Sequence, residues 1–328
     1  MQRRTLLKSA AAVTLFAAAA RKLAGLSHPV PVIDSHIHLF DPTRPGGVPW
    51  PDQSNSLLYR PALPSRYEQL SRPHGVIGAI AVECSPWLID NFWLLDVVER
   101  NPIMLGFIGN LLPETPDFGT TLDRLHRSPL FLGIRYGNLW DRDPSAAAQN
   151  PLFMGGLKVL AQSGLVLETA NPDAALISAV VRISDEVPDL RIVLDHLPNA
   201  KLPADASARR DYDANLRELA KRPHVFVKGS EILKRIDGRV SLDIASYKAD
   251  LDQLWGLFGE DRLFFGSDWP NSDSLADYDQ TFGVAQGYIA TRSASAQQRY
   301  FSKNSISVYK WRPRTAAQRQ LMMSQEAA

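Results

Sequence analysis

Short apolar runs alternate with longer amphipathic segments along most of this chain, and this alternation restricts the folds it can adopt. Most of the runs are continuously apolar, which is typical of parallel strands that are covered on both faces. The predicted strands are 30–35, 76–83, 103–110, 131–135, 165–169, 191–195, 225–228 and 263–266. The predicted helices between them are 89–100, 120–127, 152–162, 172–186, 212–221 and 247–258.

The repeated order of strand and helix predicts a parallel sheet. Eight parallel strands can close into a (β/α)8 barrel of the TIM type, and the 328 residues exceed the ~250 that such a barrel needs. An open, doubly wound sheet is the alternative, but no glycine-rich phosphate-binding turn follows the first strand. We therefore predict an α/β protein with one (β/α)8 TIM-barrel-like domain over residues 25–312.

Polar residues follow the first and last predicted strands. The first strand leads into His36 and His38, whose side chains point the same way because alternate residues of a strand share a face. The last strand leads into Asp268 and Trp269. Closure of the barrel would bring these two strand ends together at the carboxyl-terminal face, where the active sites of such barrels lie. His36, His38 and Asp268 are therefore expected to share one pocket.

Other strands also end in charged or polar residues. His196 is expected to face the pocket, and strand alternation then places Asp195 on the opposite side in a structural role. We assign five further residues to substrate binding: Arg135, Glu83, Glu168, Lys228 and Trp269. Arginine can bind a carboxylate or adjacent oxygens with two hydrogen bonds, and carboxylates can bind hydroxyl groups. In the alternative interpretation these charges neutralise one another, with Lys228 paired to Glu168 or Glu231.

The connection after the first strand, residues 41–66, is rich in proline, glycine and serine. A long connection at this end of a barrel is more often a binding loop than a linker. Aromatic side chains that would offer apolar platforms for a ring are Trp50, Trp87, Trp140 and Trp269. The polar segment 313–328 is expected to be a frayed tail.

The amino terminus has the order of an export signal: basic residues, a short alanine-rich apolar run, and small residues that suit cleavage. The segment that begins Arg3-Arg4-Thr5 resembles a twin-arginine signal, with Leu6 where phenylalanine is usual. The apolar run is too short to span a membrane. We expect residues 1–24 to direct export to the periplasm, with the twin-arginine machinery as a partner and no stable membrane insertion. A terminal amphipathic helix and an uncleaved, tethered form are the alternatives.

Charge and cysteine content exclude some classes of function. The formal net charge is +1, and the first 24 residues carry five basic residues and no acidic ones, which leaves 1 − 5 = −4 for the rest. A negative domain argues against nucleic acid as a partner. The single cysteine, Cys84, excludes an internal disulfide and a thiolate zinc cluster.

The motifs in these strands resemble those of the amidohydrolase superfamily. The matching residues are Ile33-Asp34-Ser35-His36-Ile37-His38, Gly133-Ile134-Arg135, Leu160 to Leu165, Ile192 to His196, Val225 to Lys228, Glu260 to Pro270 and Lys303-Asn304-Ser305. The chain is most similar to the branch of sugar lactonases and pyrone-dicarboxylate lactonases. The resemblance implies a metallo-dependent hydrolase fold and lactone hydrolysis. Glu83, Glu168 and Leu197 depart from the Gln, Asp and Gly usual in this branch, so the sugar specificity of relatives is not carried over.

Two interpretations of the histidine pair remain open. In one, His36, His38 and Asp268 hold a single divalent ion, Zn²⁺ or Mn²⁺, because three protein ligands are usual at a catalytic ion. His196 or Glu168 would be a fourth ligand. In the other, no metal binds, and the histidines donate hydrogen bonds to the substrate carbonyl.

The predicted function is that of an exported hydrolase which opens a lactone of a small polar molecule, sugar-acid-like or aromatic-derived. Water attacks the ring carbonyl, Asp268 takes its proton, and His36, His38 and His196 stabilise the oxyanion. Apolar surroundings at Trp269 are expected to raise the pKa of Asp268. The alternatives are a decarboxylase or hydratase on the same barrel, and a binding protein without catalysis. A small-molecule substrate is the expected partner, and a homo-oligomer is left open.

Overall fold

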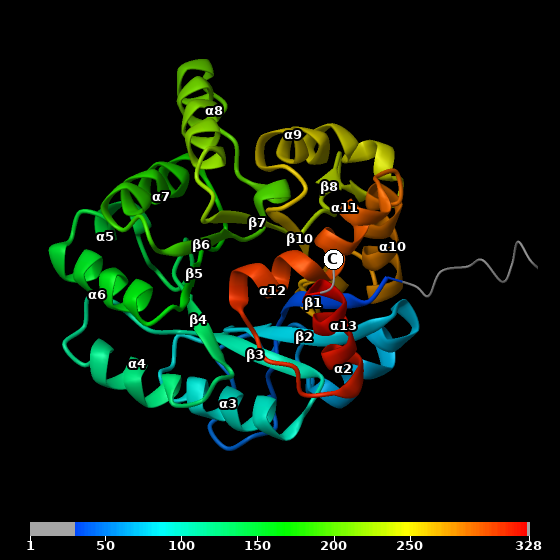
Figure 1. Ribbon diagram of the computed structural model, residues 1–328, viewed down its shortest axis with the longest axis horizontal. Helices are drawn as coiled ribbons and strands as arrows, with labels where there is room; N and C mark the ends of the chain where they lie inside the picture. The colour runs from blue at the N-terminus through cyan, green and yellow to red at the C-terminus, as the bar shows by residue number, and fades with distance from the viewer. Residues whose placement is uncertain (1–29, 327–328) are drawn as a thin grey trace, which may run out of the picture. The chain divides into compact units, whose positions relative to one another are not determined.

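The computed structural model describes residues 30–326, and the expected export signal lies outside these residues. Eight parallel strands form one sheet in sequence order, each hydrogen-bonded to the next (Figure 1). They are β1 (Val32–Ile37), β2 (Val76–Val82), β3 (Met104–Gly109), β4 (Phe131–Arg135), β5 (Val166–Glu168), β6 (Arg191–Leu194), β7 (Val225–Gly229) and β10 (Leu263–Phe265). All eight predicted strands are present, and the predicted (β/α)8 fold is confirmed.

Helices surround the strands (Figure 1). They are α2 (Pro64–Ser71), α3 (Asp90–Arg100), α4 (Phe118–His126), α5 (Pro144–Ala147), α6 (Pro151–Gln162), α7 (Ala174–Glu186), α8 (Ala206–Ala220), α9 (Lys248–Phe258), α10 (Tyr278–Ile289), α11 (Ala294–Gln298), α12 (Asn304–Tyr309) and α13 (Ala316–Glu326). A short hairpin, β8 (Arg235–Ile236) and β9 (Arg239–Val240), follows β7. No helix within residues 30–326 is long and apolar enough to cross a membrane.

Helix α8 begins at Ala206 and not at residue 212, so the connection between β6 and this helix is shorter than predicted. The carboxylate of Asp205 accepts hydrogen bonds from the backbone N–H groups of Ser207 and Ala208, at 2.9 Å each. This cap satisfies two of the donors left free at a helix start, and it stabilises a polar first turn that apolar periodicity does not reveal.

Two backbone hydrogen bonds close the barrel between the first and last strands. The N–H of Asp268 donates to the carbonyl of His36 at 2.8 Å, and the N–H of His38 donates to the carbonyl of Trp269 at 2.7 Å. The residues expected to share a pocket therefore also make the seam between β1 and β10.

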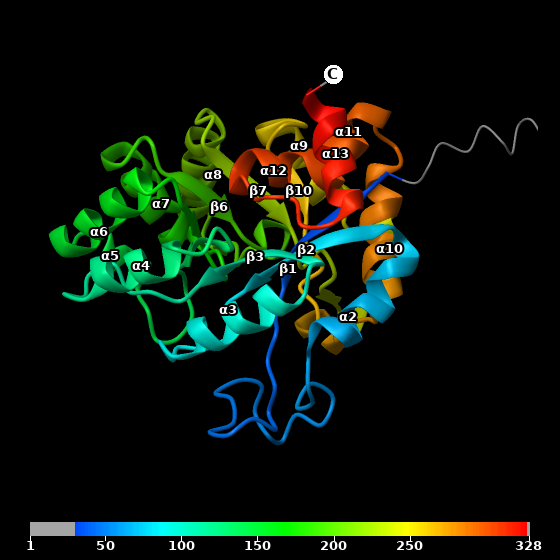
Figure 2. The same cartoon turned by 60° about the horizontal axis from the view of Figure 1, so that its bottom comes forward.

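The C-terminal segment closes one end of the barrel. The connection that follows β1 lies at the opposite end. Figure 2 shows α12 and α13 on one side of the strands and the connection after β1 on the other. Tyr309, Trp311 and Leu321 belong to the same buried cluster as strand residues such as Ile33 and Phe264. The carboxyl ends of the strands are thereby left as the open face.

The expectation that the segment 313–328 is frayed was wrong for residues 316–326, which form helix α13. Helix α13 packs against the barrel, with Gln318 fully buried and Leu321 in the core. The Gln318 amide donates to the carbonyls of Ile77 and Pro102, at 2.9 and 3.1 Å. The segment is polar on average, but a helix places Gln318 and Leu321 on one face, so a few buried contacts are sufficient to dock it.

Replacing Gln318 with alanine is expected to lower the free energy of unfolding by about 2–3 kcal/mol, because buried carbonyls would lose their donor. Urea denaturation measures this loss. The control is Gln320→Ala on the exposed face of the same helix, which is expected to change stability by less than ~0.5 kcal/mol. Equal effects of the two changes would contradict the docking of α13 through Gln318.

Candidate active site

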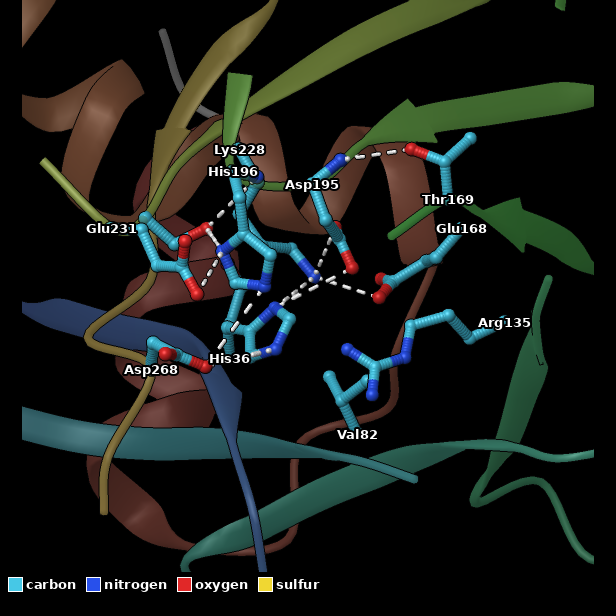
Figure 3. Close-up of polar contacts among 12 residues, drawn as sticks. His36, Val82, Arg135, Glu168, Thr169, Asp195, His196, Lys228, Glu231 and Asp268 are labelled. Atoms are coloured by element: carbon cyan, nitrogen blue, oxygen red, sulfur yellow. Dashed lines mark hydrogen bonds and ion pairs between the residues drawn. The ribbon is translucent and has the colours of Figure 1, made fainter. Parts of the chain in front are cut away.

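A cavity of about 280 Å³ opens at the carboxyl ends of the strands. The lining residues are His38, Trp50, Cys84, Arg135, Leu139, Trp140, Ala170, Asn171, His196, Glu231, Asp268 and Asn271. His36 lies next to this lining and is fully buried (Figure 3). The structure therefore brings all four predicted catalytic residues together at one site.

Asp268 lies at the centre of the three histidines. Its Oδ1 is 3.1 Å from His38 Nε2, 3.4 Å from His36 Nε2 and 4.0 Å from His196 Nε2. Its Oδ2 accepts a hydrogen bond from the side-chain amide of Asn271 at 2.7 Å. One carboxylate oxygen is thus held by the protein, and the other faces the imidazoles.

The expectation of a raised pKa at Asp268 was wrong. Burial raises the pKa of this carboxyl, but His196, His38 and the Asn271 amide outweigh burial and leave the pKa below its ordinary value. The carboxylate is therefore ionised at neutral pH and can accept a proton.

The tautomer of His38 follows from its surroundings. Its Nδ1 is 3.0 Å from the carbonyl of Val82, which can only accept, so Nδ1 carries the proton. In the neutral ring Nε2 is then an acceptor, and it is the nitrogen that faces Asp268.

Asp195 and His196 do not point to opposite sides, as strand alternation predicted. Strand β6 ends at Leu194, and His196 has a left-handed backbone with φ 58°. The alternation stops before these residues, so both side chains face the site (Figure 3). The rings of His36 and His196 have centroids 4.6 Å apart, and Asp195 Oδ2 is 3.6 Å from His36 Nδ1.

Ser230 orients the His196 ring. The Ser230 hydroxyl accepts from the backbone N–H of His196 at 3.3 Å and lies 2.9 Å from His196 Nδ1. Because a backbone N–H already donates to this oxygen, its own hydrogen can be directed to Nδ1. His196 then carries its proton on Nε2, the nitrogen nearer to Asp268.

Lys228 and Glu168 form an ion pair behind the cavity lining. Both side chains are fully buried, and Lys228 Nζ lies 2.8 Å from Glu168 and 3.1 Å from Asp195. The same ammonium is 3.2 Å from His36 Nδ1, and the Tyr309 hydroxyl donates a hydrogen bond to Glu168. Lys228 and Glu168 therefore neutralise each other, as the alternative interpretation of the sequence stated. Neither side chain lies where substrate would touch it.

Arg135 lines the cavity, but its charge is already paired. Its Nε donates to Glu83 Oε1 at 3.0 Å, and its Nη2 donates to the Glu83 carbonyl at 2.7 Å. The indole N–H of Trp140 donates to the other Glu83 oxygen at 3.1 Å. Glu83 thus holds both Arg135 and Trp140 in place.

Two of the predicted aromatic platforms, Trp50 and Trp140, line the cavity, and Trp269 does not. Trp269 is fully buried against Tyr67, with ring centroids 5.5 Å apart. The assignment of Trp269 to substrate binding was wrong, because its side chain points behind the strand end. Trp50 brings the connection after β1 to the cavity.

The sequence interpretation missed several residues of the lining, above all Asn271, Asn171 and the pocket position of Glu231. Glu231 Oε1 is 3.9 Å from His196 Nδ1, and its other oxygen accepts from the Asn199 amide at 2.8 Å. A signal was available, because Glu231 comes two residues after β7 and polar residues just after a strand reach this face.

A divalent cation fits the residue types and spacing of this site. Single ligand atoms of His36, His38 and Asp268 all lie within 4.8 Å of one another. His36 Nε2 is buried and has no hydrogen-bond partner among the described residues. It would present a lone pair to an ion with the proton on Nδ1, which lies 3.6 Å from the Asp195 carboxylate and 3.2 Å from the Lys228 ammonium. Nitrogen and carboxylate ligands of this kind suit Zn²⁺ or Mn²⁺.

The pH profile should reflect these pKa shifts. Burial, assisted by the charge of Lys228, lowers the pKa of His36, and burial lowers the pKa of His196 against the opposing charges of Glu231 and Asp268. The pKa of Asp268 is also lowered. Each group has lost its proton once the pH exceeds its pKa, so kcat/KM is expected to be constant above pH ~6.5 and to fall only below it. An acidic limb centred above pH ~6.5 would contradict this prediction.

The chain is similar to known proteins. A family model described as amidohydrolase matches residues 33–311. Two curated relatives are named L-fucono-1,5-lactonase. The protein from Burkholderia ambifaria is 28% identical over 240 residues, or 73% of this chain and 80% of the relative. The protein from Burkholderia multivorans is 26% identical over 282 residues, or 81% and 91%.

Solved structures share the fold. An amidohydrolase from Burkholderia multivorans with bound zinc has a TM-score of 0.75 at 23% identity, over 86% of this chain and 100% of that one. A putative 2-pyrone-4,6-dicarboxylic acid hydrolase from Pseudomonas putida has a TM-score of 0.66 at 20% identity, over 87% and 98%. Because the family model covers most of the chain, the resemblance drawn from the sequence is confirmed, and this protein belongs to the amidohydrolase family.

Proposed function

We propose that this protein hydrolyses the lactone of a neutral, polyhydroxylated sugar acid. The observation that carries this proposal is an ionised Asp268 set among three histidines at a cavity of about 280 Å³. Two relatives that align over most of the chain are named L-fucono-1,5-lactonase, and this supports lactone hydrolysis.

The charges of the lining favour a neutral substrate. Glu83 neutralises Arg135, which is the one lysine or arginine among the lining residues of the described chain. Glu231 and Asp268 add negative charge to the same cavity. A substrate carboxylate would therefore meet repulsion, whereas sugar hydroxyls would find acceptors at Glu231 and partners at Asn171 and Asn271.

The residues suggest a sequence of proton transfers. Asp268 Oδ1 accepts a proton from water as the water oxygen bonds to the lactone carbonyl carbon. The Nε2–H of His196 donates to the carbonyl oxygen, on which negative charge develops. The ring C–O bond then breaks, and Asp268 returns the proton to the departing oxygen. The Asn271 amide, which donates to Oδ2, keeps Asp268 oriented.

A divalent ion held by His36, His38 and Asp268 would polarise the carbonyl and lower the pKa of water. His36 would then carry its proton on Nδ1, the nitrogen that lies 3.6 Å from the Asp195 carboxylate. Without an ion, Lys228 donates to His36 Nδ1, and the Nε2–H of His36 becomes a further donor toward Asp268.

Acid release from a panel of lactones tests the function. The neutral lactones L-fucono-1,5-lactone and D-glucono-1,5-lactone are expected to be hydrolysed with a kcat/KM at least about tenfold above that for 2-pyrone-4,6-dicarboxylate. One repulsive contact between charges lowers kcat/KM by about this factor. Preference for the dicarboxylate would overturn the neutral-substrate proposal. Carbon dioxide release without ring opening would favour the decarboxylase alternative.

The same panel decides the role of metal. The metal content of the purified protein is measured, and activity is followed through chelation and re-addition of Zn²⁺ or Mn²⁺. Loss and recovery of activity would assign His36, His38 and Asp268 as ligands. Full activity after complete metal removal would assign them to hydrogen bonding and proton transfer.

We also propose that the enzyme acts in the periplasm after export by the twin-arginine machinery. The support is the sequence alone: a basic start with Arg3 and Arg4, then a short apolar run. Cell fractionation of the full chain is expected to find the protein in the periplasm. The variant with Arg3→Lys and Arg4→Lys should remain in the cytoplasm, and equal export of both would contradict the proposal.

A further inference from the structure

The side chain of Trp50 separates two hollows. One is the cavity at the carboxyl ends of the strands, with a volume of about 280 Å³. The other lies behind the indole, between the connection after β1 and helix α3, and has a volume of only about 20 Å³. Trp50 and Cys84 line both hollows. The smaller hollow has room for about one water molecule, so it cannot receive the indole if the indole moves out of the cavity.

The connection that carries Trp50 is paired at its two ends. The N–H of Phe40 donates to the carbonyl of Ala62 at 3.1 Å, and the N–H of Ala62 donates to the carbonyl of Phe40 at 2.9 Å. Between these residues the chain forms a loop that extends away from the strands (Figure 2). Trp50 lies near the middle of this loop, so the pairing at the ends does not fix its position.

Arg44 fixes the loop to helix α3. Its Nη2 lies 2.7 Å from both carboxylate oxygens of Asp90, the first residue of that helix. Its guanidinium carbon lies 4.7 Å from the centre of the Trp93 ring on the same helix. The two charged side chains are only 13% and 14% exposed. Solvent screens a pair of this kind less than a surface pair, so the contact holds the loop more firmly.

The position of Arg44 is transmitted to Trp50 over a short stretch of backbone. Arg44 Nε donates to the carbonyl of Gly47 at 2.8 Å. Val48 and Pro49 follow and line the smaller hollow together with Arg44. The ring of Pro49 fixes its own φ, so little freedom remains between Gly47 and the indole.

The indole lies beside a residue of the proposed reaction. Its ring centre is 5.8 Å from that of His38 and 5.2 Å from that of Phe40, and both pairs meet edge to face. These contacts set the plane of the indole at the cavity. An aromatic wall at this place can pack against the C–H face of a sugar ring, as aromatic side chains do in other small-molecule sites.

We propose that Arg44 is a positioning residue: its pair with Asp90 holds Trp50 as a rigid wall of the cavity, and this wall binds the lactone ring. Without the guanidinium the space behind the indole grows, and Trp50 withdraws from the ring. The lactone then loses the same contact in the ground state and in the transition state, so KM rises while kcat is retained. The kinetic part of this inference rests on the proposed lactone hydrolysis.

A double-mutant cycle tests whether Arg44 acts through Trp50. Arg44→Met is expected to raise KM for D-glucono-1,5-lactone about tenfold, the size of one aromatic contact, and to change kcat by less than about threefold. Trp50→Ala should raise KM at least as much. In the Trp50→Ala background, Arg44→Met should change KM no further, because the residue through which Arg44 acts is absent. Equal effects of Arg44→Met in the two backgrounds would overturn the inference.

Two more variants complete the kinetic test. Asp90→Asn removes the other partner of the pair and should reproduce the effect of Arg44→Met. The matched control is Arg100→Met, since Arg100 pairs with Asp96 at 2.6 Å on the same helix but its side chain is 74% exposed. This control should leave KM within about twofold. A KM unchanged by Arg44→Met, or raised as much by the control, would also overturn the inference.

Alkylation of Cys84 tests the wall without turnover. Cys84 is the single cysteine of the chain and lines both hollows with Trp50. Uncharged iodoacetamide at one fixed pH is expected to label Arg44→Met about tenfold faster than wild type or Arg100→Met, because withdrawal of the indole uncovers the thiol. Equal labelling rates in wild type and Arg44→Met would overturn the inference.

The labelling also separates this inference from the proposed function. If no lactone is hydrolysed, the lactonase proposal fails. Faster labelling of Arg44→Met than of wild type, with no further increase when Arg44→Met is added to Trp50→Ala, would still support the positioning of Trp50 by Arg44.

Discussion

Replacing Asp268 with asparagine is expected to lower kcat/KM for a neutral lactone by about 10²–10⁴-fold, the usual contribution of a general base. The amide is nearly isosteric and can keep the contact with Asn271, but it cannot accept a proton from water. The effect should fall mainly on kcat, because the proton transfer occurs in the transition state. Initial rates over a range of lactone concentrations measure it.

A matched control is available on the same segment. Asp273 is partly buried, pairs with Arg66 at 3.2 Å and lies outside the cavity lining. Asp273→Asn is expected to change kcat/KM by less than about threefold. Urea denaturation shows whether Asp268→Asn remains folded. A folded Asp268→Asn protein with activity within tenfold of wild type would contradict the role of general base.

Replacing Lys228 with methionine is expected to lower the free energy of unfolding by about 3–5 kcal/mol, because it breaks a buried ion pair and leaves carboxylates without a counter-charge. Lys228, Glu168 and Asp195 are all fully buried. Methionine has a similar shape, so the loss of charge is the main change. Urea or thermal denaturation measures the effect.

The control is Lys221→Met, since Lys221 pairs with Glu218 at 2.8 Å but its side chain is 72% exposed. This change should cost less than ~1 kcal/mol. Adding Glu168→Gln to Lys228→Met should recover part of the lost stability, because one unpaired charge is then removed. A Lys228→Met protein as stable as the control would show that the pair does not balance the buried charge.

Local patterns were sufficient to predict the scaffold. The eight strands are continuous apolar runs because both faces of each strand are covered, and this signal survives without tertiary information. The pairing of His36 and His38 followed from the two-residue repeat of a strand. Asp268 was placed beside them because the first and last strands of a barrel must meet.

The incorrect predictions concern segments in which the regular pattern of a strand or an amphipathic helix is absent. His196 has a positive φ, which brings Asp195 and His196 to the same side after β6 has stopped. Asp268 also has a positive φ of 61° and lies among imidazoles that outweigh its burial. Helix α13 is polar on average and docks through a few buried residues, so hydrophobic pattern alone did not reveal it.

The sequence by itself determined the family, the barrel and the residue types at the strand ends. The family, the barrel and these residue types can be inferred from short motifs and hydrophobic repeats. Each of these signals lies within a short stretch of sequence and can be recognised without knowledge of the rest of the fold. Only the tertiary structure decided which charges face substrate. Lys228 and Glu168 neutralise each other behind the site, and Glu83 neutralises Arg135, because burial forces each charge to find a partner from another strand. Such partners lie tens of residues apart in sequence, and only the closed barrel brings them into contact.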